Sequence, residues 1–280
     1  MAEIIHCTRQ EYDDYPALRS SDLKVFMESP LKYQDVVLNG NYKKEPTDSM
    51  RMGTMLHQFL LESKSVEGLH YLKWTGATRS GSKWEMFKDD CDSRDLPYVI
   101  CNSKKNELEL IAAQVKAIQK CKKAMEIIEA TAVREQAIAW EQQGVKCKAL
   151  LDMLCGDGPI ADLKTAADTS EKGFFWSLDD YGYHISAAFY EMARNALWKS
   201  EKVYPFYWIV VANSGWIHCK VYELQDELRD IARFQINSKL EHLRHCQETN
   251  DWTDHELNKS HVLHATNYYL EKNGLGLISG

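Results

Sequence analysis

Residues 145–164 constrain the fold of this chain more than any other stretch. Two runs of alternating apolar and polar side chains flank a Gly-Asp-Gly-Pro turn, which predicts an antiparallel hairpin centred on Asp157. In that register Asp152 and Asp162 stand directly opposite each other and point to the same face of the hairpin. Lys164, two residues further on, lies on that face as well.

The opposite face of the hairpin is apolar and is expected to pack in the core; it carries Leu151, Met153, Ala161 and Leu163. Two carboxylates whose β-carbons are about 5 Å apart repel unless a cation lies between them or one is protonated. Hard oxygen ligands suit Mg²⁺ or Mn²⁺, and a lysine beside the ion can orient or deprotonate an attacking water. The pattern indicates metal-assisted phosphodiester hydrolysis, and the alternative is a surface hairpin with scattered charges.

Composition narrows the class of protein. The 280 residues, 44% of them hydrophobic, suffice for one large domain, and no apolar run is long enough for a transmembrane helix. The first residues resemble neither a signal nor a transit peptide, so we expect a cytoplasmic protein. The eight cysteines are scattered without Cys-x-x-Cys spacing, which argues against a zinc ribbon and favours reduced thiols. A net charge of −7 argues against binding nucleic acid by bulk charge, but not against a local DNA groove.

The spacing of apolar residues predicts an α/β domain with a mixed β-sheet under a helical cover. Helices are expected at 23–28, 50–62, 84–92, 102–130, 174–197 with a break near Gly182, and 225–246, the helix at 102–130 being the longest. Besides the hairpin, strands are expected at 133–140, 204–212 and 216–224.

Two candidate metal ligands precede the hairpin. His57 borders the apolar stripe of the predicted helix at 50–62, where a lone histidine is more often structural than a ligand. Glu135 and Glu141 lie on the predicted strand before the hairpin. Either glutamate could complete a metal site, and the plainer alternative is an exposed strand residue.

The segment 75–83 is rich in Gly, Ser and Thr and contains Arg79 and Lys83. It predicts either a loop that contacts DNA phosphates through hydroxyls, N–H groups and basic side chains, or a solvated loop. Trp74 and Trp84 flank the segment and are candidates for separating the strands at a DNA end.

Several segments, in this order, resemble the PD-(D/E)xK nuclease superfamily, and its exonuclease VIII (RecE-type) branch above all. The similar segments are Leu18–Tyr33, Met52–Glu62 with its histidine, the glycine-serine loop Ala77–Trp84, the two halves of the hairpin motif (Cys147–Asp152 and Ile160–Thr165), and the aromatic segment Tyr181–Tyr190. The resemblance implies a restriction-endonuclease-like α/β core, with a central mixed β-sheet flanked by helices. It implies one domain over 1–280: a helical part at about 17–130, a catalytic core at about 131–224, and a C-terminal helix and tail at 225–280.

The resemblance also implies roles for individual residues. Asp152 and Asp162 match the metal-binding carboxylates, the Leu163 carbonyl matches a main-chain ligand, and Lys164 matches the catalytic lysine. His57 matches a histidine near the metals. Glu135 matches an acidic position before the motif and joins the catalytic set, and the implied DNA contacts are Arg79, Ser80, Ser82, Lys83 and Tyr190.

This chain departs from the family pattern at two places. Ser186 stands where the family has the glutamine of a Gln-x-x-x-Tyr element, and Leu150 and Leu151 stand where it has arginine and proline. Neither departure removes a metal ligand, but both concern residues that contact the substrate strand.

By this resemblance we expect an exonuclease with two Mg²⁺ ions, or Mn²⁺ in their place, per active site. It would digest linear double-stranded DNA from its ends, 5′ to 3′, leaving 3′ single strands for phage-type homologous recombination in a bacterial host cell. Relatives suggest a ring-shaped homo-oligomer, with a trimer favoured over a tetramer, and a single-strand annealing protein as partner, without a membrane. The alternatives are a structure-specific or restriction-like endonuclease and a decayed module that only binds DNA ends.

Overall fold

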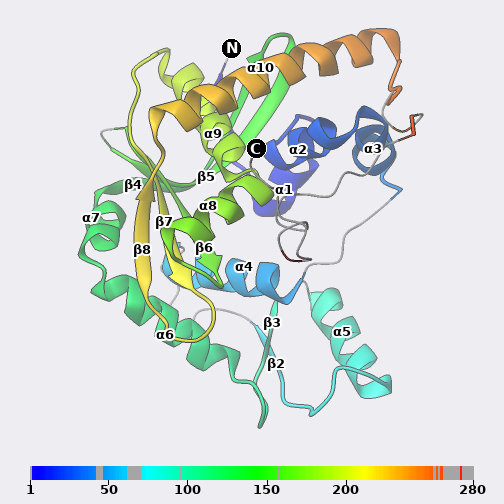
Figure 1. The fold of residues 1–280 in the computed structure, drawn as a ribbon. Helices are drawn as coiled ribbons and strands as arrows, with labels where there is room; N and C mark the ends of the chain where they lie inside the picture. The colour runs from blue at the N-terminus through cyan, green and yellow to red at the C-terminus, as the bar shows by residue number, and fades with distance from the viewer. Residues whose placement is uncertain are drawn as a thin grey trace.

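A mixed β-sheet with helices on both faces organises the chain (Figure 1). The computed structural model describes residues 2–41, 47–61, 71–94, 96–156, 158–254, 257, 259, 260 and 272, so Asp157, the predicted hairpin centre, lies outside the described residues. The sheet has the order β1-β4-β5-β6-β7-β8. These strands are β1 (Glu3–Ile4), β4 (Thr131–Gln142), β5 (Val145–Cys155), β6 (Ile160–Ala166), β7 (Phe206–Ala212) and β8 (Cys219–Glu223).

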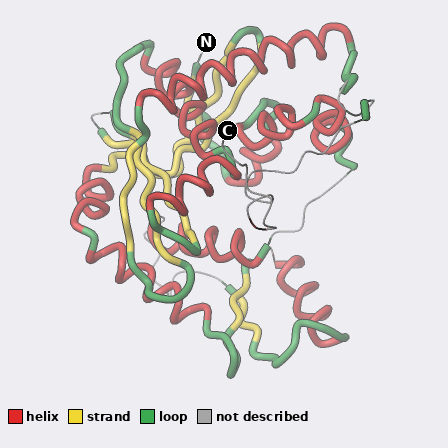
Figure 2. The backbone as a smooth tube through the Cα atoms, in the orientation of Figure 1, coloured by secondary structure: helices red, strands yellow, loops and turns green. Residues whose placement is uncertain are grey.

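Neighbouring strands of this sheet are antiparallel except β6 and β7, which are parallel. The chain between these two strands forms α8 and α9, a helical crossover of the kind that parallel strands require. A second, small sheet pairs β2 (Leu72–Trp74) with β3 (Tyr98–Ile100) in parallel, and it extends from the main body beside α5 (Figure 2). The mixed sheet is as predicted, whereas the small one was missed.

The helices lie in chain order around these sheets. They are α1 (Arg9–Asp14), α2 (Ser20–Glu28), α3 (Pro30–Tyr33) with the π-helical turn η1 (Gln34–Leu38), α4 (Asp48–Leu61), α5 (Ser82–Arg94), α6 (Glu107–Lys120), α7 (Lys122–Ala130), α8 (Glu171–Asp180), α9 (Tyr183–Trp198) and α10 (Asp226–Thr249). Within the described ranges, none of them combines the length and the apolar character that a membrane span needs. The break predicted near Gly182 is confirmed, and Gly182 has the left-handed φ of 58° that favours glycine.

The predicted single helix at 102–130 is wrong. Cys121 adopts an extended conformation (φ −86°, ψ 100°) that ends α6 and starts α7, so α10 is the longest helix that the described residues form. Both α6 and α7 bury an apolar side toward the same core. The spacing of apolar residues therefore continues across the break and does not reveal it.

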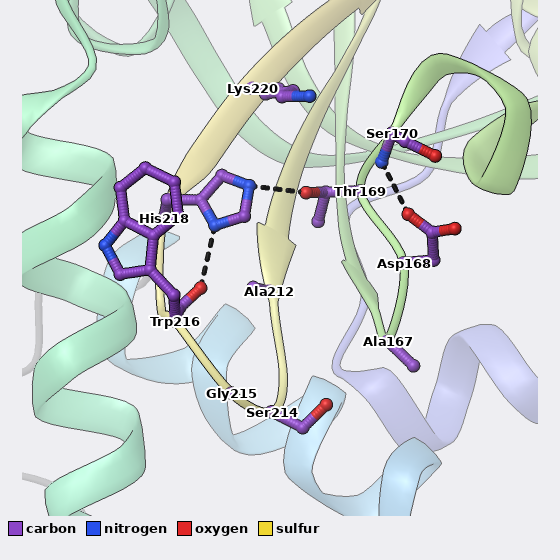
Figure 3. Close-up of a pocket in the computed structure, with 10 residues that line it drawn as sticks. All are labelled: Ala167, Asp168, Thr169, Ser170, Ala212, Ser214, Gly215, Trp216, His218 and Lys220. Carbon is purple, nitrogen blue, oxygen red and sulfur yellow. Dashed lines mark hydrogen bonds between the residues drawn. The ribbon is translucent and has the colours of Figure 1, made fainter.

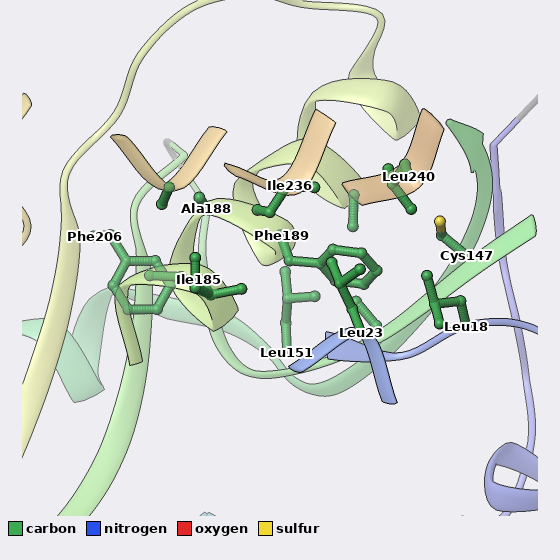
Figure 4. Packing of buried hydrophobic residues seen from close by; sticks show 14 of the residues in the cluster. Leu18, Leu23, Cys147, Leu151, Ile185, Ala188, Phe189, Phe206, Ile236 and Leu240 are labelled. Carbon is green, nitrogen blue, oxygen red and sulfur yellow. The ribbon is translucent and has the colours of Figure 1, made fainter. Parts of the chain in front are cut away.

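Two apolar cores lie on opposite faces of the sheet. On one face α2, α9 and α10 pack over β4 and β5, with Phe189 and Leu151 at the centre of the core (Figure 4). On the other face α4, α6 and α7 pack over β5, β6 and β7 around Met55, Ile118 and Ile209. The sheet is therefore buried on both sides.

The predicted hairpin register is confirmed. Met153 pairs with Ala161 and Leu154 with Ile160, as a hairpin centred on residue 157 requires. The ladder ends there, one pair before Asp152 and Asp162. Beyond that point β5 and β6 separate, and the carboxylate of Asp152 accepts a hydrogen bond from the N–H of Leu163 at 3.1 Å.

The four residues predicted to share one apolar face are all buried, but the prediction of a single face is wrong. Leu151 lies in the core under α9, whereas Met153, Ala161 and Leu163 lie in the core over α4 and α6. The strict alternation of β5 is lost near Asp152, opposite Glu135, whose left-handed backbone (φ 51°) interrupts β4. A residue with positive φ breaks the pleat, so side chains before and after it no longer alternate regularly.

Candidate active site

Three adjacent strands deliver three carboxylates to the place where β5 and β6 separate. Glu135 comes from β4, Asp152 from β5 and Asp162 from β6. Arg134 pairs with Met153 and Gln136 with Leu151, so Glu135 stands opposite Asp152 at the interruption of the ladder. The sheet register thereby holds Glu135 and Asp152, which are 17 residues apart in the sequence, side by side.

His57 reaches this cluster from α4, on the other side of the opening. Its Nε2 lies 3.0 Å from the carbonyl oxygen of Leu163, and its Nδ1 lies 3.4 Å from Oδ2 of Asp152. A carbonyl can only accept, so Nε2 carries the hydrogen in this contact, and Nδ1 faces the Asp152 carboxylate. The Leu163 carbonyl, predicted as a main-chain ligand, points at His57 and retains a second lone pair.

The ligand atoms of His57, Glu135 and Asp152 lie within 4.8 Å of one another, close enough to hold one metal ion. Two carboxylates, one imidazole and a nearby carbonyl are a donor set that suits Mg²⁺ or Mn²⁺. These residues therefore fit the divalent ion that the sequence motif implies. Glu135 and His57 were the less secure sequence candidates, and the fold brings both to Asp152.

The buried Asp162 forms an ion pair with the half-buried Lys164 beside this cluster. Burial raises the pKa of Asp162, although the ammonium of Lys164 opposes the rise. Burial by itself would lower the pKa of Lys164, but the carboxylates of Asp162 and Asp152 outweigh it and raise that pKa. Lys164 therefore stays charged here.

Aromatic residues of α9 form the wall behind Lys164. The Lys164 ammonium lies 5.1 Å from the ring centre of Tyr183, a cation–π distance. Tyr190, predicted to contact DNA, is half-buried beside Asp162 and Lys164; burial and then the Asp162 carboxylate raise its pKa to about 12. Tyr190 thus lies beside the Asp162–Lys164 ion pair.

A second lysine, which sequence reasoning did not assign, also faces this site. Lys24 of α2 donates to the carbonyl of Tyr181 (2.9 Å) and to the hydroxyl of Ser186 (3.1 Å). Burial, and then the charge of Lys164, lower the pKa of Lys24 to about 8. Ser186 stands where the nuclease family is expected to have a glutamine, and the ammonium of Lys24 lies next to the Ser186 hydroxyl. Only the packing of α2 on α9 reveals this lysine, since no motif marks it.

The glycine-serine loop is not part of the candidate metal cluster. Arg79, Ser80, Ser82 and Lys83 are exposed, and Arg79 forms an ion pair with Asp48 at 2.6 Å. Asp48 begins α4, nine residues before His57, which is about 14 Å along the helix. The loop therefore lies at the far end of the helix that carries His57.

Trp84 cannot separate DNA strands without leaving its packing. It is buried at the start of α5 and stacks on Phe87, and its ring also contacts Trp74 and Tyr98. The flanking tryptophans thus hold α5 against the small β2–β3 sheet, and a role of either one at a DNA end stays a prediction.

Comparison with known proteins gives the family. Residues 19–260 match the family described as PDDEXK-like domain of unknown function (DUF3799). The chain belongs to this PDDEXK-like family. No curated protein matches it.

Solved structures give the fold. A provisionally assigned exonuclease from Eubacterium rectale superimposes with a TM-score of 0.63 at 15% identity, over 96% of this chain and 98% of that one. A phage-related exonuclease from Haemophilus somnus 129PT covers 86% of this chain and 100% of its own, at 12% identity and a TM-score of 0.33, too low to carry an argument. The α/β restriction-endonuclease-like fold expected from the motif is thus confirmed.

Proposed function

We propose that this protein is a metal-dependent exonuclease that degrades linear double-stranded DNA from its ends. The observation that carries the proposal is the cluster of His57, Glu135 and Asp152 beside the Asp162–Lys164 ion pair. Its family and its structural neighbour support the same chemistry. Digestion from 5′ to 3′, leaving 3′ single strands for phage-type recombination in the cytoplasm of a bacterial host, follows from the sequence resemblance.

The chain's own residues would share the work as follows. Asp152, Glu135 and His57 would hold one divalent ion, and Asp162 with Asp152 and the Leu163 carbonyl would hold a second. When bound, such ions polarise the phosphate and lower the pKa of water. Lys164 orients the attacking water and offsets the negative charge that develops on the phosphate.

Two groups of residues would bind the DNA substrate. Lys24 and Tyr190 lie beside the site and would contact the phosphate next to the scissile bond. Arg79, Ser80, Ser82 and Lys83 would contact the duplex further away, where hydroxyls and basic side chains position a phosphate backbone without reading its sequence.

The assembly proposed is a ring-shaped homo-oligomer, a trimer in preference to a tetramer, that acts with a single-strand annealing protein. A ring reconciles the net charge of −7 with DNA binding, since basic residues can line the lumen while acidic ones face outward. Light scattering on the purified protein gives the mass directly. A monomer of 32.3 kDa at micromolar concentration would contradict the ring.

Digestion of linear duplex DNA tests the proposed activity. With Mg²⁺ or Mn²⁺ we expect loss of a linear, 5′-phosphorylated duplex, no cutting of a closed circle, and no activity with chelator or in Lys164→Ala. Labels at either end then give the polarity. Cutting of the circle would establish an endonuclease instead, and metal binding without any hydrolysis would leave a DNA-end-binding module.

A further inference from the structure

A second recess lies at the carboxyl ends of the parallel strands β6 and β7 (Figure 3). It has a volume of about 410 Å³. The loop 167–170 after β6 forms one wall, and the turn 214–216 with His218 and Lys220 forms the other. The carboxyl ends of parallel strands are a common place for ligands in α/β sheets, because the loops that follow both strands leave the sheet there.

A large aromatic ring stands open at this recess. Trp216 is 81% exposed in the bend between β7 and β8. One face of its ring stacks on His218, with ring centres 4.5 Å apart and planes at 22°. His218 covers one face of the Trp216 indole. Because the residue is 81% exposed, the opposite face is in contact with solvent. An exposed aromatic residue by itself needs no explanation. Trp216 stands out because its ring is both stacked on His218 and part of the lining of the recess.

Hydrogen bonds hold this stacked pair in place. His218 Nδ1 donates to the carbonyl of Trp216 at 2.7 Å, and its Nε2 lies 2.6 Å from the hydroxyl of Thr169, within hydrogen-bond distance. The hydroxyl of Tyr222 donates to the carbonyl of Thr169 at 2.6 Å. The stacked pair of Trp216 and His218 is therefore tied both to the loop after β6 and to strand β8. Little side-chain freedom remains to be lost on binding.

The charges of the recess favour a neutral ligand over a phosphate. Asp168 and Lys220 are the charged residues among those that line it, and their charges offset each other. The Asp168 carboxylate accepts from the N–H of Ser170 at 2.8 Å, and this bond lowers its pKa, so it stays ionised. A phosphate would meet this carboxylate, whereas a flat heteroaromatic ring would meet the indole face and the surrounding hydroxyls.

The recess also lies at the right distance from the catalytic cluster. Strand β6 carries Asp162 and Lys164 and continues through Ala166 into the recess at Ala167. Three residues of strand span about 10 Å, which is about the length of three stacked nucleotides at 3.4 Å each. We propose that this recess binds one unstacked base of the DNA strand that passes through the active site, and that the base stacks on the open face of Trp216.

This inference rests on the proposed function for its substrate, so its test uses binding without hydrolysis. The probe is a fluorescent duplex with a four-nucleotide single-stranded tail, either 5′ or 3′, in the presence of chelator. Each tail position is replaced in turn by an abasic residue, and the affinity of each probe is measured by anisotropy. Trp216→Ala is expected to weaken binding of the intact probe about tenfold, the effect of losing one stacked base.

The decisive result is a double-mutant cycle between the base and the tryptophan. At one tail position the abasic replacement should weaken binding to the wild type but leave binding to Trp216→Ala unchanged. Trp216→Tyr keeps an aromatic face and should restore most of the affinity, which excludes misfolding as the cause. Phe234→Ala is the matched control, because Phe234 is 76% exposed on α10, outside the residues that line the recess.

Two outcomes would overturn the inference. Trp216→Ala could bind the tailed probe as tightly as Phe234→Ala does, or the abasic replacements could act equally in the wild type and in Trp216→Ala. If the wild type still digests linear DNA with Mg²⁺, only the base pocket fails. If no DNA is hydrolysed with any divalent metal while the Trp216-dependent base effect persists, the nuclease proposal fails and the pocket stands.

Discussion

At the scale of single residues, Glu135 distinguishes the site from an ordinary sheet. Its left-handed backbone interrupts β4 opposite Asp152, and its carboxylate lies beside Asp152 and His57. We predict that Glu135→Gln weakens Mn²⁺ binding by at least about tenfold, because it removes a charged ligand. Isothermal titration calorimetry measures the affinity.

Glu141→Gln is the matched control for Glu135→Gln. Glu141 lies on the same strand, β4, but is exposed and outside the cluster of ligand atoms. Its affinity for Mn²⁺ should equal that of the wild type. An equal loss of affinity in both variants would show a general effect of negative charge and would remove Glu135 from the metal site.

Lys24 predicts a pH dependence. Its pKa is lowered to about 8 by burial and by Lys164, so its charge is fully present below that pH and is lost as the pH rises through it. Lys24→Gln should therefore weaken DNA binding clearly at pH 7, about five- to tenfold for one close phosphate contact. At pH 9 wild type and variant should converge. The affinities of wild type and Lys24→Gln for a tailed duplex are measured with chelator over this pH range. A ratio of the two affinities that stays constant with pH would contradict the proposed phosphate contact of Lys24.

At the scale of elements, an ion-pair network fixes the helix that carries His57. Glu107 of α6 is fully buried and makes two 2.7 Å contacts with Arg51 of α4, and it accepts a further bond from the N–H of Ile100 in β3. Glu107 therefore ties α4, the helix that carries His57, to α6 and to the small sheet.

Glu107→Ala should reduce the free energy of unfolding by about 3 kcal/mol, since it removes the bidentate partner of the nearly buried Arg51 and leaves it the longer ion pair with Asp48. Urea denaturation followed by circular dichroism measures the change. Glu109→Ala, on the exposed side of the same helix turn, should change stability by about 0.5 kcal/mol or less. Similar losses in the two variants would mean that the network does not stabilise α4.

At the scale of the whole molecule, α10 closes the core above the catalytic strands. Its buried residues Ala232, Ile236, Leu240 and Leu243 belong to the same apolar cluster as Phe189 and Leu151. We propose on this basis that the helical part, the catalytic core and the C-terminal helix fold as one domain. Each of these parts supplies residues to this shared core, since Leu23 of α2 also lies in it.

A chain that ends at Leu224 should therefore fail to fold cooperatively. Removing α10 exposes the apolar surface of α9, and each large side chain left without its partner costs about 2–5 kcal/mol. A chain that ends at Asp254 keeps α10 and Trp252, which stacks on Tyr33, and it should melt cooperatively. Differential scanning calorimetry compares the two, and a cooperative transition in the shorter chain would show that the core is complete without α10.

Much of the site could be predicted from sequence because it rests on local rules. A turn with two glycines and alternating flanks sets a hairpin register, and the register puts Asp152, Asp162 and Lys164 together. The break at Gly182 follows in the same way from one residue that tolerates positive φ. The resemblance to the nuclease family added the fold and named His57, Glu135 and Leu163, which periodicity alone left undecided.

Only the tertiary structure decided what no local pattern encodes. His57 meets Leu163 across 106 residues, and Lys24 meets Ser186 across 162, because helix packing and not sequence spacing brings them together. The extended backbone of Cys121 and the left-handed backbone of Glu135 cannot be predicted from local sequence either. The apolar spacing continues across Cys121, and tertiary contacts hold Glu135. The sequence by itself determined the hairpin and its carboxylates, whereas the packing of α2, α4 and α9 against the sheet decided which imidazole and which second ammonium face them.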